Sequence, residues 1–213
     1  MEEIRIYNAN LKELGVMERK EAHATGAWHI TFHCWIVNPS NDSMLFQLRS
    51  KGKKNYPDMF DISAAGHLLA GEEVRDGIRE VSEELGIAIS FDELSFLGYR
   101  IEADDQENGQ KNREYQAVYI SKVEKNLDEF EPQIEEVAGL MWMRISDALS
   151  LFSNNASSVP MEGIVYNEET RQWEQKKRIV TVADFIPRIQ QYYLTMAIMG
   201  ERFIENKYPL AIS

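Results

Sequence analysis

The sequence contains a single cysteine, Cys34, and no long apolar run. One cysteine excludes an intramolecular disulfide and suits a reducing compartment. No apolar stretch reaches the roughly 18 residues that a membrane-spanning helix needs. Residues 1–15 are acidic and lack the apolar core of a signal peptide. We therefore expect a cytoplasmic protein with no membrane-spanning segment.

Positive charge is also scarce, with 23 Lys and Arg against 35 Asp and Glu and a net charge of −12. This balance argues against non-specific binding to nucleic acid or to an anionic membrane. It still allows a phosphorylated small molecule, because a metal ion can supply positive charge locally. The sequence shows no internal repeat, and its 213 residues suit a single domain over 1–213.

Apolar periodicity predicts several strands, one central helix, further strands and closing helices. In the clearest strand, Trp28–Val37, every second residue from Ile30 to Ile36 is apolar and shares one face. Further strands are predicted at Glu3–Tyr7, Gly15–Lys20, Met44–Arg49, Met59–Ala65, Leu94–Ile101, Tyr115–Val123 and Glu136–Arg144. Helices are predicted at about Val74–Leu85, at Ile145–Phe152 and in Thr181–Phe203, the last forming a C-terminal helix at about 181–205. This order indicates an α+β fold with a mixed β-sheet sandwiched between α-helices.

Two segments carry no clear strand or helix pattern. Asp104–Asn112 is polar and is interpreted as a loop between two strands. Residues 153–175 are interpreted as a loop-rich insertion. The sequence of neither segment identifies a ligand.

The predicted central helix carries many carboxylates. Residues 66–87 read GHLLAGEEVRDGIREVSEELGI, and Glu80, Glu83 and Glu84 lie on one arc of the helix. Like charges at this spacing repel each other. A group of carboxylate oxygens is also what Mg²⁺ or Mn²⁺ prefers, and such an ion would cancel the repulsion. The alternative is an ordinary solvated acidic face.

The same stretch closely resembles the Nudix box, the signature of the Nudix hydrolases. The resemblance implies the Nudix fold, with metal ligands at Glu80, Glu83 and Glu84 and at the backbone carbonyl of Gly66. It also implies that Arg79 orients the glutamates through a salt bridge.

The interval between the first glutamate of the box and its Arg-Glu pair is one residue shorter here than in the family. Either Glu72 or Glu73 therefore takes the role of that first glutamate.

The resemblance extends beyond the box to the Nudix branch related to isopentenyl diphosphate isomerase. It is carried by HATGAWHITFHCWIVN, by QLRSxGKxxxP and by FDISAAGH. It implies a second metal site at His29, His67 and Glu114, with His23 one residue away from a third histidine ligand. The alternative for each histidine is a surface or packing role.

The same resemblance implies that Arg49 and Lys53 hold a diphosphate, against the alternative of a solvated basic loop. Isomerases carry a catalytic cysteine where this chain has Ala65, so isomerisation is not expected. Cys34 lies on the apolar face of its strand and is interpreted as a core residue.

The function expected from these features is metal-dependent hydrolysis of a diphosphate linkage in a nucleoside or related small-molecule diphosphate, with Mg²⁺ or Mn²⁺. Glu83 and Glu114 are both candidates for the general base, and Glu80 and Arg79 complete the catalytic set. The alternatives are an isomerase-like enzyme and a non-catalytic nucleotide or ADP-ribose sensor. A homodimer is the alternative to a monomer.

Overall fold

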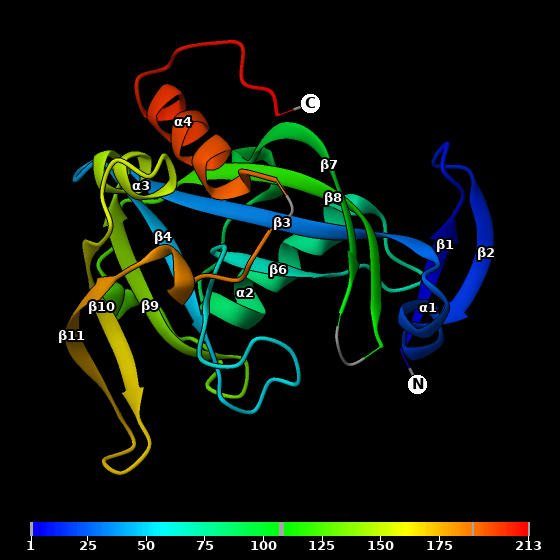
Figure 1. Ribbon diagram of the computed structural model, residues 1–213, viewed down its shortest axis with the longest axis horizontal. Coiled ribbons are helices and arrows are strands. Elements are labelled where there is room, and N and C mark those ends of the chain that lie inside the picture. Colours follow the sequence, from blue (N-terminus) through cyan, green and yellow to red (C-terminus); the bar gives the residue numbers. More distant parts are fainter. Residues whose placement is uncertain (1, 107–108, 189, 213) are drawn as a thin grey trace.

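The computed structural model describes residues 2–106, 109–188 and 190–212, which form one mixed β-sheet with helices on both faces (Figure 1). The strands are β1 (Glu3–Tyr7), β2 (Glu13–Glu18), β3 (Trp28–Asn38), β4 (Ser43–Arg49), β5 (Phe60–Asp61), β6 (Ala64–His67), β7 (Ser95–Asp105), β8 (Lys111–Lys122), β9 (Val137–Arg144), β10 (Val159–Asn167) and β11 (Gln172–Val180). The α-helices are α1 (Arg19–Thr25), α2 (Arg79–Leu85), α3 (Ile145–Phe152) and α4 (Tyr192–Ile204). Short 3₁₀ helices lie at Val74–Ile78, Phe91–Glu93, Leu127–Glu129 and Val182–Asp184.

Strand β3 is the centre of the sheet. The strand order is β11-β10-β9-β4-β3-β1-β2, and β6 and β8 also pair with β3. The β3–β8 pairing is parallel, whereas β6 and β4 run antiparallel to β3. Strand β7 pairs antiparallel with β8. The predicted α+β fold with a mixed sheet is confirmed.

The two faces of β3 pack against different helices. Phe32 and Cys34 belong to a buried cluster that includes Val81 and Leu85 of α2. Trp35 belongs to a second buried cluster, which contains side chains of α3 and α4. The sheet is therefore covered by α2 on one face and by α3 and α4 on the other, and β3 is buried on both faces.

Several elements have the predicted bounds or differ by one or two residues at the ends. Strand β1 and helix α3 match their predicted ranges, and Cys34 is fully buried in the core as expected. Burial raises the pKa of the Cys34 thiol to about 12, so this thiol is not a nucleophile at neutral pH.

The predicted strand Gly15–Lys20 is wrong at its end, because α1 begins at Arg19. The helix is short and ends at Gly26, which has the left-handed φ of 75° that favours glycine. It buries Ala22 and His23. A seven-residue helix gives too little periodicity to be recognised in the sequence.

The predicted loop Asp104–Asn112 is shorter than expected, because β7 and β8 extend into it. The strands pair as far as Asp105 and Lys111. Residues 107 and 108 lie outside the described residues. The polar residues of these strand ends face one another, as in the ion pair between Arg113 and Asp105 at 2.5 Å.

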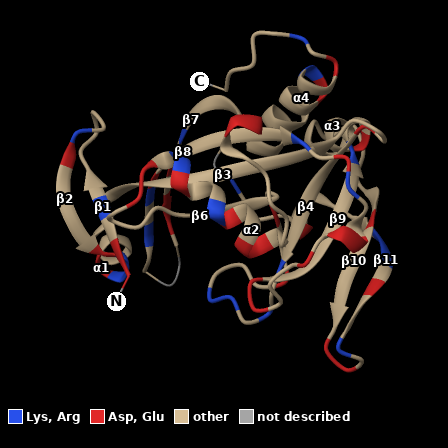
Figure 2. Ribbon diagram, turned by 180° about the vertical axis from the view of Figure 1, so that it is seen from behind, with Lys and Arg blue, Asp and Glu red and all other residues tan. Residues whose placement is uncertain are grey.

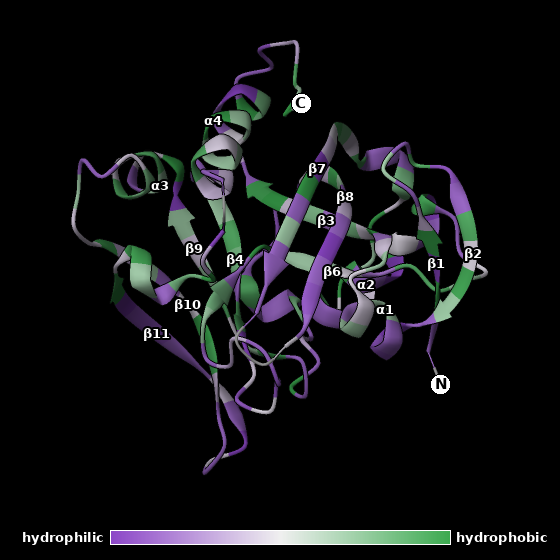
Figure 3. Cartoon of the chain, turned by 45° about the vertical axis from the view of Figure 1, so that its right-hand side comes forward, coloured by the Kyte–Doolittle hydropathy of each residue, from purple (hydrophilic) through white to green (hydrophobic). Residues whose placement is uncertain are grey.

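The loop-rich interpretation of 153–175 is also wrong, since β10 and the first four residues of β11 lie there, and the two strands form a hairpin. Strand β10 continues the sheet by pairing with β9. Strand β11 is the edge strand and is drawn almost entirely as hydrophilic in Figure 3. A strand exposed to solvent on its outer side lacks the apolar alternation that identifies strands in a sequence.

The predicted helix Thr181–Phe203 is wrong in its first half. Ile186 N donates to the Phe60 carbonyl, so the chain is extended before Pro187. Helix α4 begins only at Tyr192, and Ile189, predicted to lie on its apolar face, is outside the described residues. The predicted helix Val74–Leu85 likewise begins as a 3₁₀ turn and becomes α-helical at Arg79.

Candidate active site

The acidic helix α2 buries two of its three predicted ligands. Glu80 and Glu84 lie one turn apart with only 9% and 6% of their surface exposed, whereas the Glu83 side chain is 51% exposed. Figure 2 shows basic and acidic segments side by side at α2. The alternative of an ordinary solvated acidic face is therefore wrong for Glu80 and Glu84.

Gly66 of β6 makes room for the Glu80 carboxylate. A Cβ atom added at Gly66 would lie 2.0 Å from the Glu80 carboxyl carbon and from Oε1. Any residue larger than glycine at this position would displace the Glu80 carboxylate, which lies directly against the strand backbone. The structure thus brings together Gly66 and Glu80, which the sequence placed in one metal site.

Arg79 organises the carboxylates around the start of α2. Its Nη1 lies 2.7 Å from Glu80 Oε1 and donates to Glu83 Oε2 at 2.8 Å. Its Nε donates to Glu72 Oε1 at 2.6 Å. Glu73 instead pairs with Arg5 at 3.0 Å. Of the two candidates for the first glutamate of the box, Glu72 is therefore the partner of Arg79.

Glu84 is held from the sheet side. Its Oε2 accepts hydrogen bonds from Gln47 Nε2 and from the Ala65 backbone N–H, both at 3.0 Å. Burial raises the pKa of Glu80 and the pKa of Glu84 to about 7. Two carboxylates in a site of low dielectric favour a bound cation, because the cation offsets their charge. These residues therefore fit a hard divalent ion.

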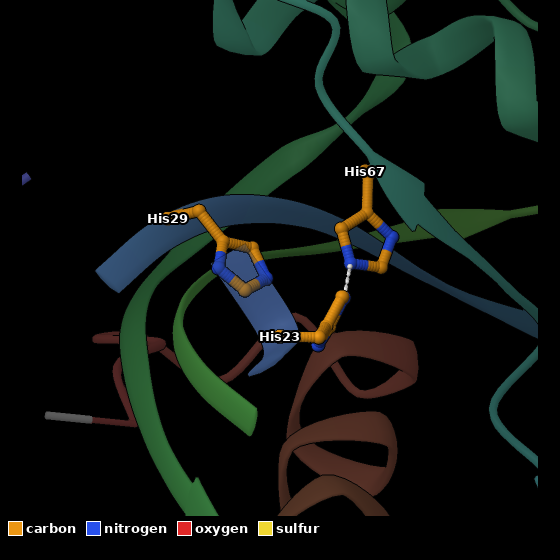
Figure 4. A group of neighbouring side chains, drawn as sticks. All are labelled: His23, His29 and His67. Atoms are coloured by element: carbon orange, nitrogen blue, oxygen red, sulfur yellow. Dashed lines mark hydrogen bonds between the residues drawn. The ribbon is translucent and has the colours of Figure 1, made fainter. Parts of the chain in front are cut away.

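Three histidines from separate elements form a second group (Figure 4). His23 comes from α1, His29 from β3 and His67 from β6. Within the described parts of the chain, they are the only three His, Cys, Asp or Glu side chains whose ligand atoms all lie within 4.8 Å of one another. The three glutamates of α2 do not form such a group among the described residues.

The ring nitrogens of this histidine cluster are arranged as ligands. His29 Nδ1 lies 2.9 Å from the Ala27 carbonyl, an acceptor only, so Nδ1 carries the proton and Nε2 has a free lone pair. His23 Nε2 and His67 Nε2 are 3.0 Å apart. Burial lowers the pKa of His23 and of His67, which keeps both rings neutral.

Two buried atoms of the cluster, His23 Nδ1 and His29 Nε2, have no hydrogen-bond partner in the described structure. Buried imidazole nitrogens without a hydrogen-bond partner fit a metal ion of borderline softness. Glu114 of β8 lies beside His29 in the β3–β8 register, and its Oε1 is 4.0 Å from His29 Nε2. The predicted set of His29, His67 and Glu114 is thus close in space, and His23 joins it.

The two predicted phosphate ligands point inward. Arg49 Nη1 is 3.7 Å from Asp61 Oδ2, and its Nη2 donates to the Asn55 carbonyl at 3.1 Å. Lys53 forms an ion pair with Glu136. Burial and then the nearby Arg49 lower the pKa of Lys53. Neither side chain belongs to a fully solvated loop.

The model of the NUDIX domain family matches residues 27–161 of this chain. The chain belongs to this family. It is 35% identical over 190 residues to an uncharacterized Nudix hydrolase of Clostridium acetobutylicum, which covers 88% of this chain and 91% of the relative. It is 28% identical over 180 residues to an isopentenyl-diphosphate delta-isomerase of Klebsiella pneumoniae, covering 83% of this chain and 91% of the relative.

The crystal structure of a Deinococcus radiodurans protein shares the fold. It superposes with a TM-score of 0.53 at 19% identity, over 72% of this chain and 90% of that one. Among the described residues, no helix combines the length and the apolar character needed to cross a membrane.

The Nudix site contains buried polar residues that the sequence analysis missed. Arg100 and Glu102 of β7 and Gln116 of β8 are buried, and they adjoin Glu114. The sequence contains one signal for them, because Arg100 and Gln116 alternate with apolar residues inside predicted strands. Such alternation is typical of a strand with one polar face. It would have indicated a polar wall beside the predicted metal ligand Glu114.

Proposed function

We propose that this Nudix protein is a metal-dependent hydrolase that cleaves a diphosphate linkage in a nucleoside or related diphosphate compound. The observation that carries the proposal is the buried pair Glu80 and Glu84 beside the glycine cradle at Gly66. Two buried carboxylates with a raised pKa are destabilising unless a cation compensates them. A role in metal binding is therefore the best explanation for the burial of these two carboxylates.

Glu80 and Glu84 would hold Mg²⁺ or Mn²⁺, together with the Gly66 carbonyl and with Glu83. When bound, such an ion neutralises phosphate charge and lowers the pKa of a coordinated water. Arg79 keeps Glu80 and Glu83 in place through its ion pairs.

Arg49 and Lys53 would bind the phosphate oxygens. Their present partners are the carboxylates Asp61 and Glu136, acceptors that phosphate oxygens resemble.

Two residues are proposed as alternatives for the general base. Glu83 is exposed enough to reach a solvent water, and Arg79 orients it. Glu114 is buried next to the histidine cluster and could accept a proton only within that pocket. A separate test of each variant at saturating metal distinguishes them, since loss of the base lowers kcat.

The histidine cluster with Glu114 would hold a second metal ion. Imidazole nitrogens favour ions such as Zn²⁺ or Co²⁺ over Mg²⁺. The chain is proposed to act as one cytoplasmic domain over 1–213, in keeping with its single buried cysteine.

The proposal is tested by incubating the protein with a panel of nucleoside and sugar diphosphates and Mg²⁺. Release of phosphate or of a mononucleotide is the expected result. Binding of a nucleotide without any turnover across the panel would contradict the proposal and favour the sensor.

A second candidate function is isomerisation of an isoprenoid diphosphate. It is favoured by the complete histidine cluster and by the similarity to an enzyme named as an isomerase. It is opposed by Ala65, which offers no thiol, and by the buried charges of Arg100 and Glu102 where a hydrocarbon would need a dry apolar pocket. Incubation with isopentenyl diphosphate and Mg²⁺ in D₂O is expected to give no deuterated dimethylallyl diphosphate. Deuterium incorporation above the no-enzyme control would establish the isomerase.

A further inference from the structure

The carboxylate of Glu114 is held by a chain of buried polar side chains. Gln116 Nε2 donates to Glu114 Oε2 at 2.8 Å, and Arg100 Nη1 donates to Gln116 Oε1 at 2.6 Å. The same Arg100 nitrogen donates to Glu102 Oε2. We propose that Gln116 and Arg100 are positioning residues, which fix Glu114 with its Oε1 turned toward the histidine cluster. This inference rests on the proposed function, in which Glu114 is a metal ligand.

Strand register brings these residues into line. Glu114 pairs with His29 of β3 on one side and with Glu102 of β7 on the other. In the next row on the same face, Gln116 stands between Thr31 and Arg100. Because side chains two residues apart point to the same face of a strand, the two rows contact each other across that face. The chain of hydrogen bonds is thus built into the sheet.

The donors and acceptors allow only one orientation of the Gln116 amide. A guanidinium has donors and no acceptor, so Arg100 requires the amide oxygen to face it. The amide N–H groups must then face Glu114, which accepts them as a carboxylate. Since Gln116 is fully buried, no water competes for these contacts.

The two oxygens of the Glu114 carboxylate therefore have different neighbours. Oε2 accepts from Gln116 and, at 3.5 Å, from Thr31 Oγ1. Oε1 has the unpartnered His29 Nε2 at 4.0 Å, too far for a hydrogen bond. Both of these atoms present lone pairs to the gap between them, an arrangement that suits a shared cation.

Burial of the Arg100 guanidinium costs free energy that packing alone does not explain. Only 5% of its surface is exposed, and its Nε and Nη2 have no partner in the described structure. Its guanidinium lies 4.5 Å from the centre of the Tyr192 ring, which compensates in part through a cation–π contact. A buried guanidinium with unpartnered nitrogens costs stability that an apolar residue would not. The orientation of Gln116 by Arg100 would explain why Arg100 is buried despite this cost in stability.

The test is a Co²⁺ titration of the metal-free protein, followed by visible absorption. Absorption bands that are lost in a His67→Gln variant report Co²⁺ at the histidine cluster. Gln116→Met has a similar volume but no donor, and we expect it to bind Co²⁺ about 10- to 100-fold more weakly, as is typical for loss of a residue that orients a ligand. Glu114→Gln should weaken Co²⁺ at least as much.

Gln47→Met is the matched control. Gln47 is equally buried and donates in the same way to a carboxylate, that of Glu84 in the other ligand group. It should leave Co²⁺ affinity at the histidine cluster unchanged. Thr31→Val removes the longer contact to Glu114 Oε2 and should weaken Co²⁺ less than Gln116→Met. Thr31→Val also tests the inference if circular dichroism shows that Gln116→Met does not fold.

The inference is overturned if a folded Gln116→Met, or Thr31→Val in its place, binds Co²⁺ as tightly as the wild type. It is also overturned if Glu114→Gln leaves the Co²⁺ affinity unchanged, because Glu114 is then not a ligand. Failure of the proposed function is separate from both results. If the wild type cleaves no diphosphate but Gln116→Met still binds Co²⁺ more weakly, the hydrolase proposal is wrong and the positioning roles of Gln116 and Arg100 stand.

Discussion

The carboxylate group of α2 and the histidine cluster are two buried groups of proposed metal ligands, and they differ in chemical character. At Glu80 and Glu84, burial raises the pKa of each carboxyl group to about 7. At His23 and His67, burial lowers the pKa of each imidazole. In both groups burial disfavours the charged form. The carboxylates must therefore ionise at a cost before they bind a metal, whereas the histidines are already neutral ligands.

This difference suggests a division of labour between two kinds of ion. Oxygen ligands suit Mg²⁺, and imidazole nitrogens suit ions such as Zn²⁺ or Co²⁺. Variants that remove one group at a time can separate their roles.

The largest effect is expected from Glu84→Gln. The amide keeps the shape of the side chain but loses the charge, so Mg²⁺-dependent hydrolysis should fall by at least about 100-fold, more than is typical for loss of an outer-shell partner. The measurement is kcat/KM at saturating Mg²⁺, with circular dichroism to show that the fold is intact. Glu168→Gln, at an exposed residue of the β10–β11 turn, serves as the control. Unchanged kinetics in Glu84→Gln would remove this residue from the metal site.

His67→Gln should act on the other group. We expect Co²⁺ affinity to fall by at least about 100-fold, since a direct ligand is lost. Mg²⁺-dependent hydrolysis should fall much less than in Glu84→Gln. The measurements are Co²⁺ titration and hydrolysis on the same preparation, and equal losses of hydrolysis in the two variants would show that the groups act as one site.

The two groups also differ in how far the sequence predicts them. The carboxylates lie within one short segment of regular spacing, so Glu80 and Glu84 could be found together, and the family resemblance added Gly66. The histidine cluster needs a contact between α1, β3 and β6, and the helix α1 was not predicted. Glu114 was found through a family resemblance. Its partners Arg100 and Gln116 could not be found in this way, because their contacts with Glu114 depend on the pairing register of β7, β8 and β3. Spacing in one helix is visible in a sequence, but a row across three strands is not.

The same distinction applies to the fold. Buried strands such as β3 have the apolar pattern that predicts them. The edge strand β11 lacks this pattern, because most of its residues are exposed to solvent. The segment before α4 lacks it as well, because Pro187 interrupts the helix that the apolar spacing predicts.

A moderate effect is expected from Arg49→Ala. Hydrogen bonds to charged groups contribute about 1.5–3 kcal/mol, so KM should rise by about tenfold or more if the contact to phosphate is equal in the ground and transition states. The measurement is the steady-state kinetics of the best substrate in the panel. An unaltered kcat/KM would return Arg49 to a structural role with Asp61.

The smallest effect concerns His33, which lies on the same face of β3 as His29 but outside the histidine cluster. Trp35 Nε1 donates to Tyr192 Oη at 3.0 Å, so the Tyr192 hydroxyl hydrogen is free to donate to His33 Nδ1 at 3.1 Å. Burial lowers the pKa of His33 well below its usual value. The unfolded chain therefore takes up a proton before the native state does, and stability is lost as pH falls below about 6.5.

His33→Gln should reduce this loss of stability at low pH. A glutamine keeps an acceptor for Tyr192 but does not titrate, so the slope of unfolding free energy against pH should decrease by up to about 1.4 kcal/mol per pH unit. Urea unfolding at several pH values between 5 and 7.5 provides the measurement (the range follows the reference pKa of about 6.5). Parallel curves for the two proteins would show that His33 is protonated equally in both states.

The central claim is that α2 supplies the metal platform for cleavage of a diphosphate. It is tested most directly by phosphate or nucleotide release from the diphosphate panel, measured in Mg²⁺ for the wild type, Glu84→Gln and His67→Gln side by side. The account predicts turnover by the wild type, near-complete loss in Glu84→Gln and a clearly smaller loss in His67→Gln. Turnover in Glu84→Gln equal to that of the wild type would contradict it.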